Sequence, residues 1–140
     1  MSDGRWLLAK SALWRIAAAD DAAEWFERIR RGLVHICTPT LLEIGFSARN
    51  STDWASLVTE PPVSLMPVTY ATPAAELRAL EVQRLLAGKG RHRAPGIPDL
   101  LVAATAEAES LTVLHLDKDF DLIAEITGQP VEWIVPRGSL

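Results

Sequence analysis

The sequence contains one cysteine and no apolar run long enough to cross a membrane. Because Cys37 is alone, it excludes an internal disulfide and a metal cluster made of thiolates. A membrane-spanning helix needs about 20 consecutive apolar residues. The chain opens with Asp3 and Arg5 rather than with a basic segment followed by a long apolar one. We therefore expect a cytoplasmic protein that does not enter a membrane.

Several common sites for metals, nucleotides and covalent catalysis are also missing. His35, Cys37 and His115 lack the spacing of zinc ligands, and we interpret them as strand residues. The segment Gly88-Lys89-Gly90 is too short for a phosphate-binding loop. No pairing of serine or cysteine with histidine indicates a protein nucleophile. The sequence therefore gives no support for a zinc site, a phosphate-binding loop or a covalent nucleophile of these kinds.

The composition is typical of one folded domain, which we expect to span residues 1–140. Hydrophobic residues make up 49% of the chain and charged residues 23%. The net charge is -4, so nucleic-acid binding must depend on a local basic patch. The segment Val135-Pro136-Arg137-Gly138-Ser139 resembles both a native tail and the remnant of a cleavable tag.

Short apolar segments alternate with helical patterns along the chain. Strands are expected at 6–9, 33–36, 111–116 and 131–135. Helices are expected at 12–16, 22–31, 40–48, just after 51–53, at 74–87, at 97–106 and up to 127. Strands separated by helices indicate a mostly parallel sheet covered on both faces. We therefore predict a three-layer α/β/α fold. We also expect Ser11 and Thr38 to cap helices.

The segment 97–106 is apolar on nearly all sides and carries one carboxylate, Asp99, in its first turn. Pro98 suits the first position of a helix, and a negative charge there interacts favourably with the helix dipole. A helix that is apolar all round is buried, however, and a buried carboxylate is costly unless it is paired or bound to a metal. Asp99 is therefore either a helix-start charge or part of a functional site.

Other carboxylates follow the predicted strands. Asp117 and Asp119 come directly after the strand 111–116, and Glu43 lies on the helix after 33–36. Ligands of open α/β sheets bind at the carboxyl ends of the strands. Carboxylates brought together at this edge, with Asp99, are the ligands that Mg²⁺ or Mn²⁺ prefers.

Each of these carboxylates also has a purely structural interpretation. Glu43, Ser47 and Asn50 form a polar stripe at helical spacing that is typical of a solvated face. Asp117 and Asp119 suit a helix cap and a first-turn charge. The local sequence patterns alone leave both interpretations open.

The segment 117–121 begins like a calcium-binding EF-hand loop, but the match fails. The sixth position, where that loop needs glycine, is Leu122. The twelfth, where it needs glutamate, is Gly128. We therefore do not expect calcium binding of this kind.

Four segments together resemble one known family, the PIN-domain ribonucleases, and within it the VapC toxins of bacterial toxin–antitoxin pairs. In chain order they are Leu8-Ala9-Lys10-Ser11-Ala12-Leu13, Thr40-Leu41-Leu42-Glu43-Ile44-Gly45, Ile97-Pro98-Asp99-Leu100-Leu101-Val102-Ala103-Ala104 and Leu114-His115-Leu116-Asp117-Lys118-Asp119-Phe120. The resemblance covers nearly the whole chain. No single segment is specific, but their order in a chain of this length is.

This resemblance implies a PIN-like fold and a Mg²⁺- or Mn²⁺-dependent endoribonuclease. In the family pattern, Glu43, Asp99 and Asp117 would hold the metal, Asp119 would assist or substitute, and Ser11 would orient the group. The resemblance also implies a VapB-type antitoxin as partner, RNA as substrate and a homodimer.

One position departs from the family pattern. The family has an aspartate two residues before the Ser or Thr that follows the first strand, and this chain has Ala9. The first metal ligand is therefore missing, through natural loss or deliberate inactivation, and we expect the chain to be inactive. The alternatives are a silent module that binds antitoxin or RNA without cleavage and a phosphoacceptor domain. The latter is disfavoured, because it needs a carboxylate where Ala9 stands.

Two further sets of residues suggest binding surfaces. A basic loop leads into the segment 97–106, and we expect it to contact RNA, although a merely solvated loop explains it as well. Its residues are Lys89, Arg91, His92 and Arg93. Aromatic residues on expected helices suggest partner contacts, with burial in the core as the alternative. These are Trp14, Trp25, Phe26 and Trp54.

Overall fold

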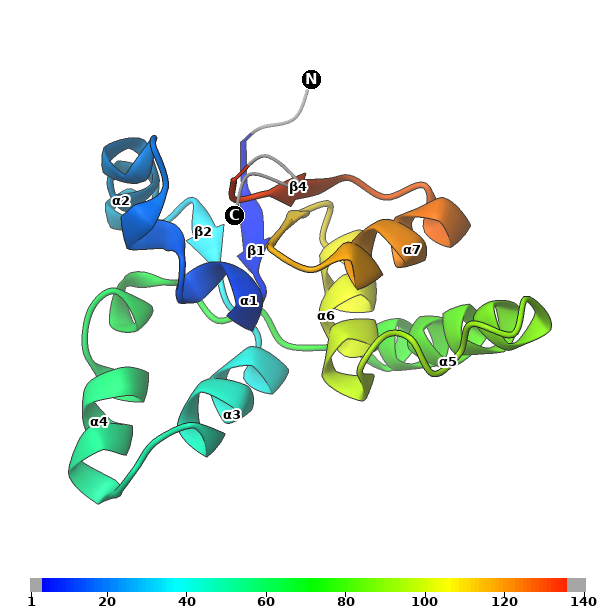
Figure 1. The fold of residues 1–140 in the computed structure, drawn as a ribbon, viewed down its shortest axis with the longest axis horizontal. Helices are drawn as coiled ribbons and strands as arrows, with labels where there is room; N and C mark the ends of the chain where they lie inside the picture. The colour runs from blue at the N-terminus through cyan, green and yellow to red at the C-terminus, as the bar shows by residue number, and fades with distance from the viewer. Residues whose placement is uncertain (1–3, 136–140) are drawn as a thin grey trace.

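The computed structural model describes residues 4–135, and within them one sheet of four parallel strands (Figure 1). The strands are β1 (Trp6–Leu8), β2 (Val34–His35), β3 (Thr112–His115) and β4 (Val131–Trp133). Their order across the sheet is β2-β1-β3-β4. The prediction of a mostly parallel sheet is confirmed, and residues 136–139 of the tail-like segment lie outside the described part.

Seven α-helices and two short 3₁₀ helices connect or follow these strands in the described part. They are α1 (Lys10–Leu13), η1 (Ile16–Ala18), α2 (Ala22–Arg30), α3 (Thr38–Phe46), α4 (Ser51–Thr59), η2 (Val63–Leu65), α5 (Pro73–Gly88), α6 (Ile97–Ala108) and α7 (Lys118–Thr127). Within residues 4–135, none of these helices has the length and apolar character to cross a bilayer.

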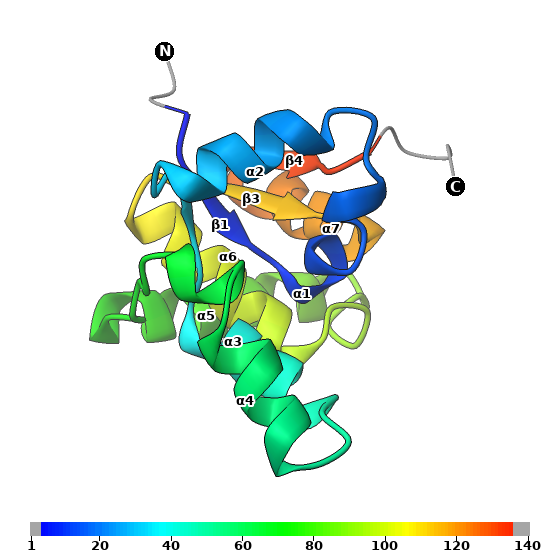
Figure 2. The same ribbon diagram turned by 90° about the vertical axis from the view of Figure 1, so that its left-hand side faces the viewer.

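Alternate residues of β1 point into two separate cores on the two faces of the sheet. Trp6 and Leu8 pack with residues of α1, α2 and α3. Leu7 packs on the opposite face with residues of α5, α6 and α7. Successive side chains of a strand point to opposite faces, so one strand can supply both cores. The three-layer α/β/α arrangement is therefore confirmed, with α2 and α6 on opposite sides of β1 and β3 (Figure 2).

The segment expected to be a buried helix is α6, which extends two residues further than predicted, to Ala108. Leu100 and the residues 102–106 are buried. The helix packs against α5 on one side and contacts β1 and β3. Its first turn, which carries Asp99, faces the end of the sheet where the parallel strands terminate.

Two predicted helix caps are wrong. Ser11 lies inside α1, and Ala9 occupies the cap position without a side-chain hydrogen bond. Thr38 lies inside α3, which Cys37 precedes. In both cases the chain enters a helix directly from a buried segment, so backbone geometry rather than a capping side chain sets the start. Gly128 ends α7 as predicted, at a φ of 73° that favours glycine.

Candidate active site

The carboxyl ends of the two central strands bring position 9 and Asp117 to the same edge of the sheet. In the parallel register Leu8 pairs with Leu114, and the Ala9 N–H donates to the Leu114 carbonyl at 2.9 Å. Ala9 follows β1 directly, and Asp117 begins α7 just beyond β3. The buried Ala9 side chain therefore lies where the family pattern has an aspartate.

Asp99 lies at the N-terminus of α6, partly buried, and its own surroundings oppose its ionisation. Burial raises its pKa to about 6, and the negative charges of Glu43, Asp117 and Asp119 add to the effect. These three carboxylates come from α3 and from the start of α7, far from Asp99 in sequence. The fold therefore brings the four predicted acids into one electrostatically coupled group.

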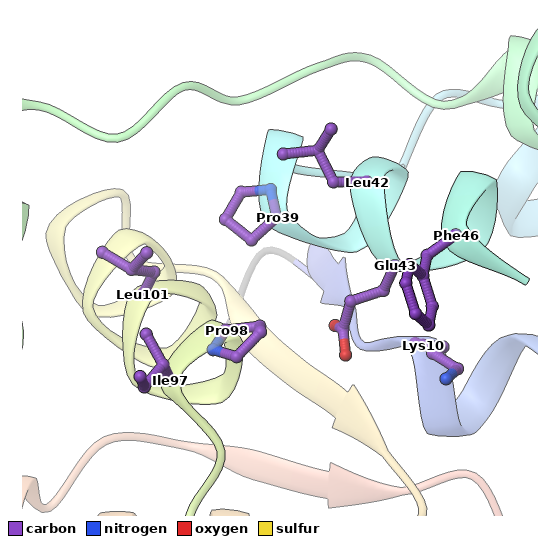
Figure 3. Close-up of a pocket in the computed structure, with 8 residues that line it drawn as sticks. All are labelled: Lys10, Pro39, Leu42, Glu43, Phe46, Ile97, Pro98 and Leu101. Atoms are coloured by element: carbon purple, nitrogen blue, oxygen red, sulfur yellow. The ribbon is translucent and has the colours of Figure 1, made fainter.

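Glu43 projects from α3 toward α6, into an apolar pocket of about 520 Å³ (Figure 3). Partial burial raises the pKa of its carboxyl group, and the nearby Lys10 ammonium opposes this shift. Ser47 is exposed, and Asn50 caps α4 by accepting a hydrogen bond from the Asp53 N–H at 2.8 Å. Ser47 and Asn50 are therefore exposed as a polar stripe would be, whereas Glu43 is partly buried at the pocket.

Asp117 and Asp119 form the cap that the local pattern suggested. One carboxylate oxygen of Asp117 accepts a hydrogen bond from the Asp119 N–H at 2.9 Å. Burial, and next the charge of Asp117, raise the pKa of Asp119, while Lys118 and Arg91 oppose the shift. Capping uses one oxygen of Asp117 and so leaves the other oxygen for a second role.

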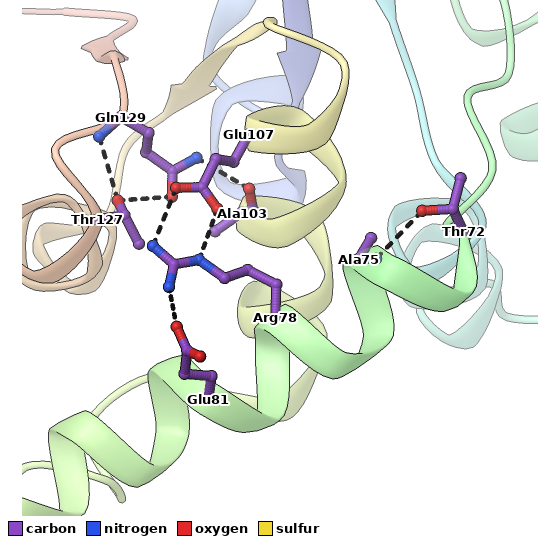
Figure 4. A network of polar contacts seen from close by, with 8 residues as sticks. All are labelled: Thr72, Ala75, Arg78, Glu81, Ala103, Glu107, Thr127 and Gln129. Carbon is purple, nitrogen blue, oxygen red and sulfur yellow. Dashed lines mark hydrogen bonds and ion pairs between the residues drawn. The ribbon is translucent and has the colours of Figure 1, made fainter.

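A polar network anchors the far half of α6 (Figure 4). The Arg78 guanidinium on α5 donates to Glu107 at 2.8 Å and also pairs with Glu81. The Gln129 amide donates to the Ala103 carbonyl at 2.8 Å. These contacts fix α6 against α5 and α7, so the position of Asp99 is set by long-range packing.

The four carboxylates do not form a ready-made metal cage. Within residues 4–135, no group of three or more His, Cys, Asp or Glu side chains is gathered closely enough to hold a metal ion. Their chemistry nevertheless fits a hard divalent cation, because all four donors are carboxylates and their mutual repulsion favours a bound positive charge. The donor set thus fits such an ion, and position 9 supplies no oxygen to it.

Ser11 acts on the backbone beside the acids. Its hydroxyl oxygen accepts a hydrogen bond from the Leu116 N–H at 2.9 Å, across 105 positions of sequence. Leu116 directly precedes Asp117, so this contact holds the segment that presents the carboxylate. The hydroxyl therefore contacts the segment next to Asp117, in line with the orienting role that the resemblance implied.

The predicted basic loop is exposed, and one of its residues lies beside the acids. Lys89, Arg91, His92 and Arg93 are all exposed. Arg91 and Lys118 line a polar pocket of about 300 Å³ with Asp119. Sequence reasoning missed Lys118 and Lys10, although each directly neighbours a position of the family pattern.

The aromatic residues divide between core and surface. Trp25 is 1% exposed and packs edge-on against Trp6 at 5.0 Å, so its prediction as a partner contact is wrong. Its position on α2 faces the sheet, whereas Phe26 is turned away. Trp14, Phe26 and Trp54 are 47%, 41% and 47% exposed. Trp14 and Phe26 line a groove of about 320 Å³ between α1, α2 and η2.

The chain is similar to known proteins over nearly its whole length. The family model described as "PIN domain" matches residues 11–126. The chain is similar to Ribonuclease VapC2 of Mycobacterium tuberculosis (strain CDC 1551 / Oshkosh), with 57% identity covering 98% of this chain and 97% of the relative. Ribonuclease VapC51 of Mycobacterium tuberculosis (strain ATCC 25618 / H37Rv) is 50% identical over 72% of each chain.

Solved structures have the same fold. DNA-bound VapBC from Salmonella typhimurium contains a chain with a TM-score of 0.74 and 22% identity, covering 93% of this chain and 98% of that one. VapBC-5 from Mycobacterium tuberculosis gives a TM-score of 0.65 and 26% identity, covering 94% and 98%. The chain therefore belongs to the PIN-domain family, and within it to the VapC group.

Proposed function

We propose that this protein is the toxin of a VapBC-type toxin–antitoxin pair, built as a metal-dependent endoribonuclease that hydrolyses RNA phosphodiester bonds. One observation carries the proposal: Asp99 on α6 lies beside Glu43 of α3 and Asp117 and Asp119 at the start of α7, and burial together with these charges raises its pKa to about 6. The chain is 57% identical to Ribonuclease VapC2. Both observations support a site for a divalent cation and RNA.

The metal we propose is Mg²⁺ or Mn²⁺. Glu43, Asp99 and Asp117 would hold it, with Asp119 assisting. When bound, such an ion lowers the pKa of a water and neutralises charge on the phosphate. Ser11 fixes the backbone before Asp117, and Lys10 balances the charge of Glu43. No side chain is required as a covalent nucleophile.

The chain as it stands is proposed to be inactive because of Ala9. An alanine at this position removes one ligand and one negative charge from the edge where the other acids lie. The second candidate function, a silent module that binds RNA or antitoxin, rests on this same residue. Both candidates share the fold and the binding surfaces, and they differ in whether an aspartate at position 9 creates cleavage.

We assign the partners to two apolar surfaces. The groove lined by Trp14 and Phe26 would receive a VapB-type antitoxin. The face of α3 and α6 that exposes Leu42, Phe46 and Ile97 would pair two copies in a homodimer. We further propose that residues 1–140 act as a single PIN domain in the cytoplasm, where the RNA substrate is present.

Changing Ala9→Asp should create metal-dependent RNA cleavage that the given chain lacks. The expected gain is at least about 100-fold, because misplacing reacting groups by about 1 Å has a cost of this size. The protein with Ala9 and the Ala9→Asp variant are purified side by side. Both are assayed on total cellular RNA with Mg²⁺, Mn²⁺ or chelator. The double variant Ala9→Asp/Asp99→Asn controls for contaminating nucleases. Equal cleavage by the given chain and the Ala9→Asp variant would show that the site is misplaced.

A further inference from the structure

We propose that His115 is a positioning residue that fixes Asp117 through its backbone N–H, with Asp121 and Trp133 holding the imidazole in place. The inference rests on the proposed function in one respect: it treats Asp117 as a ligand of the divalent cation. His115 has no exposed surface with which to contact a metal or RNA, so its role is to act through Asp117.

The position of His115 is unusual for a polar side chain. It is the last residue of β3 and is 0% exposed, following Val113 and Leu114 in a strand that is otherwise apolar at its centre. Its ring packs between Phe120 and Trp133, with ring centroids 5.1 Å and 5.0 Å away. Burying an imidazole has a cost that an apolar side chain would avoid. A contact that only a ring nitrogen can make would explain its presence.

Such a contact exists between His115 and Asp117. The Asp117 N–H donates to the Nδ1 atom of His115 at 3.1 Å. Asp117 lies beyond the last paired residue of β3, so among residues 4–135 no neighbouring strand pairs with it to supply an acceptor for this N–H. Without a hydrogen bond to this N–H, the backbone at Asp117 would be less restricted to one conformation. The Nδ1 atom of His115 therefore accepts the hydrogen bond that a paired strand would otherwise accept.

This hydrogen bond determines the tautomer of the ring. A backbone N–H can only donate, so Nδ1 must be unprotonated and the neutral ring carries its hydrogen on Nε2. Nε2 is one of the buried side-chain atoms without a hydrogen bond in the described part of the chain, and it lies 3.8 Å from the Asp121 carboxylate. That carboxylate accepts from the Trp133 indole at 3.0 and 3.1 Å. Asp121 thus attracts the hydrogen to the side of the ring away from Asp117.

The same short segment is held at two further points. The Leu116 N–H donates to Ser11, and the Asp119 N–H donates to Asp117, each at 2.9 Å. The backbone N–H groups of Leu116, Asp117 and Asp119 therefore each donate to a side-chain acceptor. These acceptors belong to Ser11, His115 and Asp117. Residues that support a metal ligand in this way change metal affinity by about 10- to 100-fold when they are removed.

Two variants separate positioning from simple packing. His115→Phe keeps a flat ring between Phe120 and Trp133 but has no acceptor for the Asp117 N–H. His115→Asn places its amide oxygen at the position of Nδ1, since both atoms are bonded to Cγ, but leaves a cavity. If His115 only fills space, the Phe variant should be the better protein in every assay. If it positions Asp117, the two variants should rank in opposite orders for stability and for metal binding.

The first measurement follows the Asp117 amide in the chain as it stands. Nitrogen NMR should show the hydrogen of the His115 ring on Nε2, and hydrogen exchange should show protection of the Asp117 N–H. The Asn variant should keep this protection, and the Phe variant should lose at least about 10-fold of it while remaining folded. A hydrogen on Nδ1, or equal protection in the Phe variant, would overturn the proposal.

The second measurement is Mn²⁺ titration in the Ala9→Asp background. Mn²⁺ affinity should fall about 10-fold with His115→Phe and stay within about threefold with His115→Asn, although Asn is the less stable variant. If the less stable variant is also the one with the weaker Mn²⁺ affinity, a positioning role of His115 is refuted. If Mn²⁺ fails to bind the Ala9→Asp parent at all, the proposed function fails, while the exchange experiment still decides the role of His115.

Discussion

Asp99 is a carboxylate whose surroundings make its charged form costly in the absence of a cation. Its pKa is about 6 in the folded protein and 3.8 as a reference value, so the folded state binds the proton more tightly than the unfolded state does. The stability that follows from this is present below about pH 4 and is lost as the pH rises through 6. At neutral pH the ionised Asp99 therefore destabilises the metal-free protein.

Asp99→Asn should accordingly stabilise the metal-free protein more at high pH than at low pH. Between pH 4.5 and 7.5, with chelator, the difference in unfolding free energy between variant and parent should grow by about 1 kcal/mol. This figure is discounted for the partial exposure of Asp99. The measurement is denaturant unfolding of both proteins across this range.

Asp53→Asn is the matched control for this pH dependence. The Arg49 N–H and side chain lower the pKa of Asp53, so this carboxylate is already ionised throughout the pH range tested. Its replacement should change stability by an amount that stays constant from pH 4.5 to 7.5. A difference for Asp99→Asn that is equally flat would show that the acids do not repel one another as described.

At the scale of elements, Gly45 allows α3 and α4 to pack closely. A Cβ atom added at Gly45 would lie 2.5 Å from the Nε1 atom of Trp54, which is too close for any real contact. Glycine weakens a helix interior by about 1 kcal/mol relative to alanine, so its presence in α3 needs a packing reason. The indole of Trp54, which packs against Gly45, supplies that reason. Trp54 is 47% exposed, so about half of its surface is covered.

Gly45→Ala should therefore destabilise the protein by about 1 kcal/mol, since overpacking of this kind costs more than helix propensity returns. Gly88→Ala is the control, because it lies at the end of α5 with nothing within 4 Å of an added Cβ. That change should be neutral or stabilising. Thermal unfolding of both variants tests the pair. Similar shifts in the two would mean that Trp54 does not rest on Gly45.

The sequence predicted the existence of most elements more accurately than their ends. The strand 111–116 became β3 over Thr112–His115, and 33–36 became β2 over Val34–His35. Within residues 4–135, Leu116 follows β3 without pairing, and Ile36 follows β2 in an isolated bridge to Val68, so the apolar pattern runs longer than each strand. The ends depend on which neighbour supplies a hydrogen-bond partner, and a linear pattern does not contain that information.

At the scale of the whole molecule, charge is distributed unevenly. The net charge is -4, and the acids at the carboxyl edge of the sheet repel a polyanion. RNA binding must therefore depend on basic residues next to that edge. Arg91 lies next to this edge, because it lines a pocket with Asp119 and its charge lowers the pKa of that carboxyl group. It is therefore positioned to contact an RNA phosphate.

Neutralising the loop with Arg91→Gln/Arg93→Gln should weaken RNA binding by the given chain and flatten its salt dependence. Loss of two phosphate contacts should reduce the slope of log affinity against log salt by about 1 to 1.5 for single-stranded RNA. The variant Arg5→Gln/Arg31→Gln makes the same charge change just before β1 and near the start of β2, at the opposite edge. That control variant should have the same slope of log affinity against log salt as the parent protein. The proposal for the loop fails if the two double variants lose slope equally.

Several properties of this protein follow from its sequence alone. The alternation of strand and helix patterns determined the parallel α/β fold, because each pattern reports a local period of apolar residues. The apolar segment 97–106 determined a buried helix for the same reason. The placement of Asp117 and Asp119 after a strand, and of Asp99 at a helix start, predicts that acids gather at one edge of the sheet.

The tertiary structure alone decided which polar atoms meet. Ser11 was predicted as a helix cap but accepts a hydrogen bond from Leu116, 105 positions away. His115 was interpreted as a strand residue, yet its ring nitrogen supports Asp117 because Trp133 and Asp121 pack around it. Trp25 and Phe26 are neighbours in sequence, yet Trp25 is buried and Phe26 is 41% exposed. These contacts depend on how the helices pack on the sheet. Packing brings together residues whose spacing along the sequence follows neither the helix period nor the strand period.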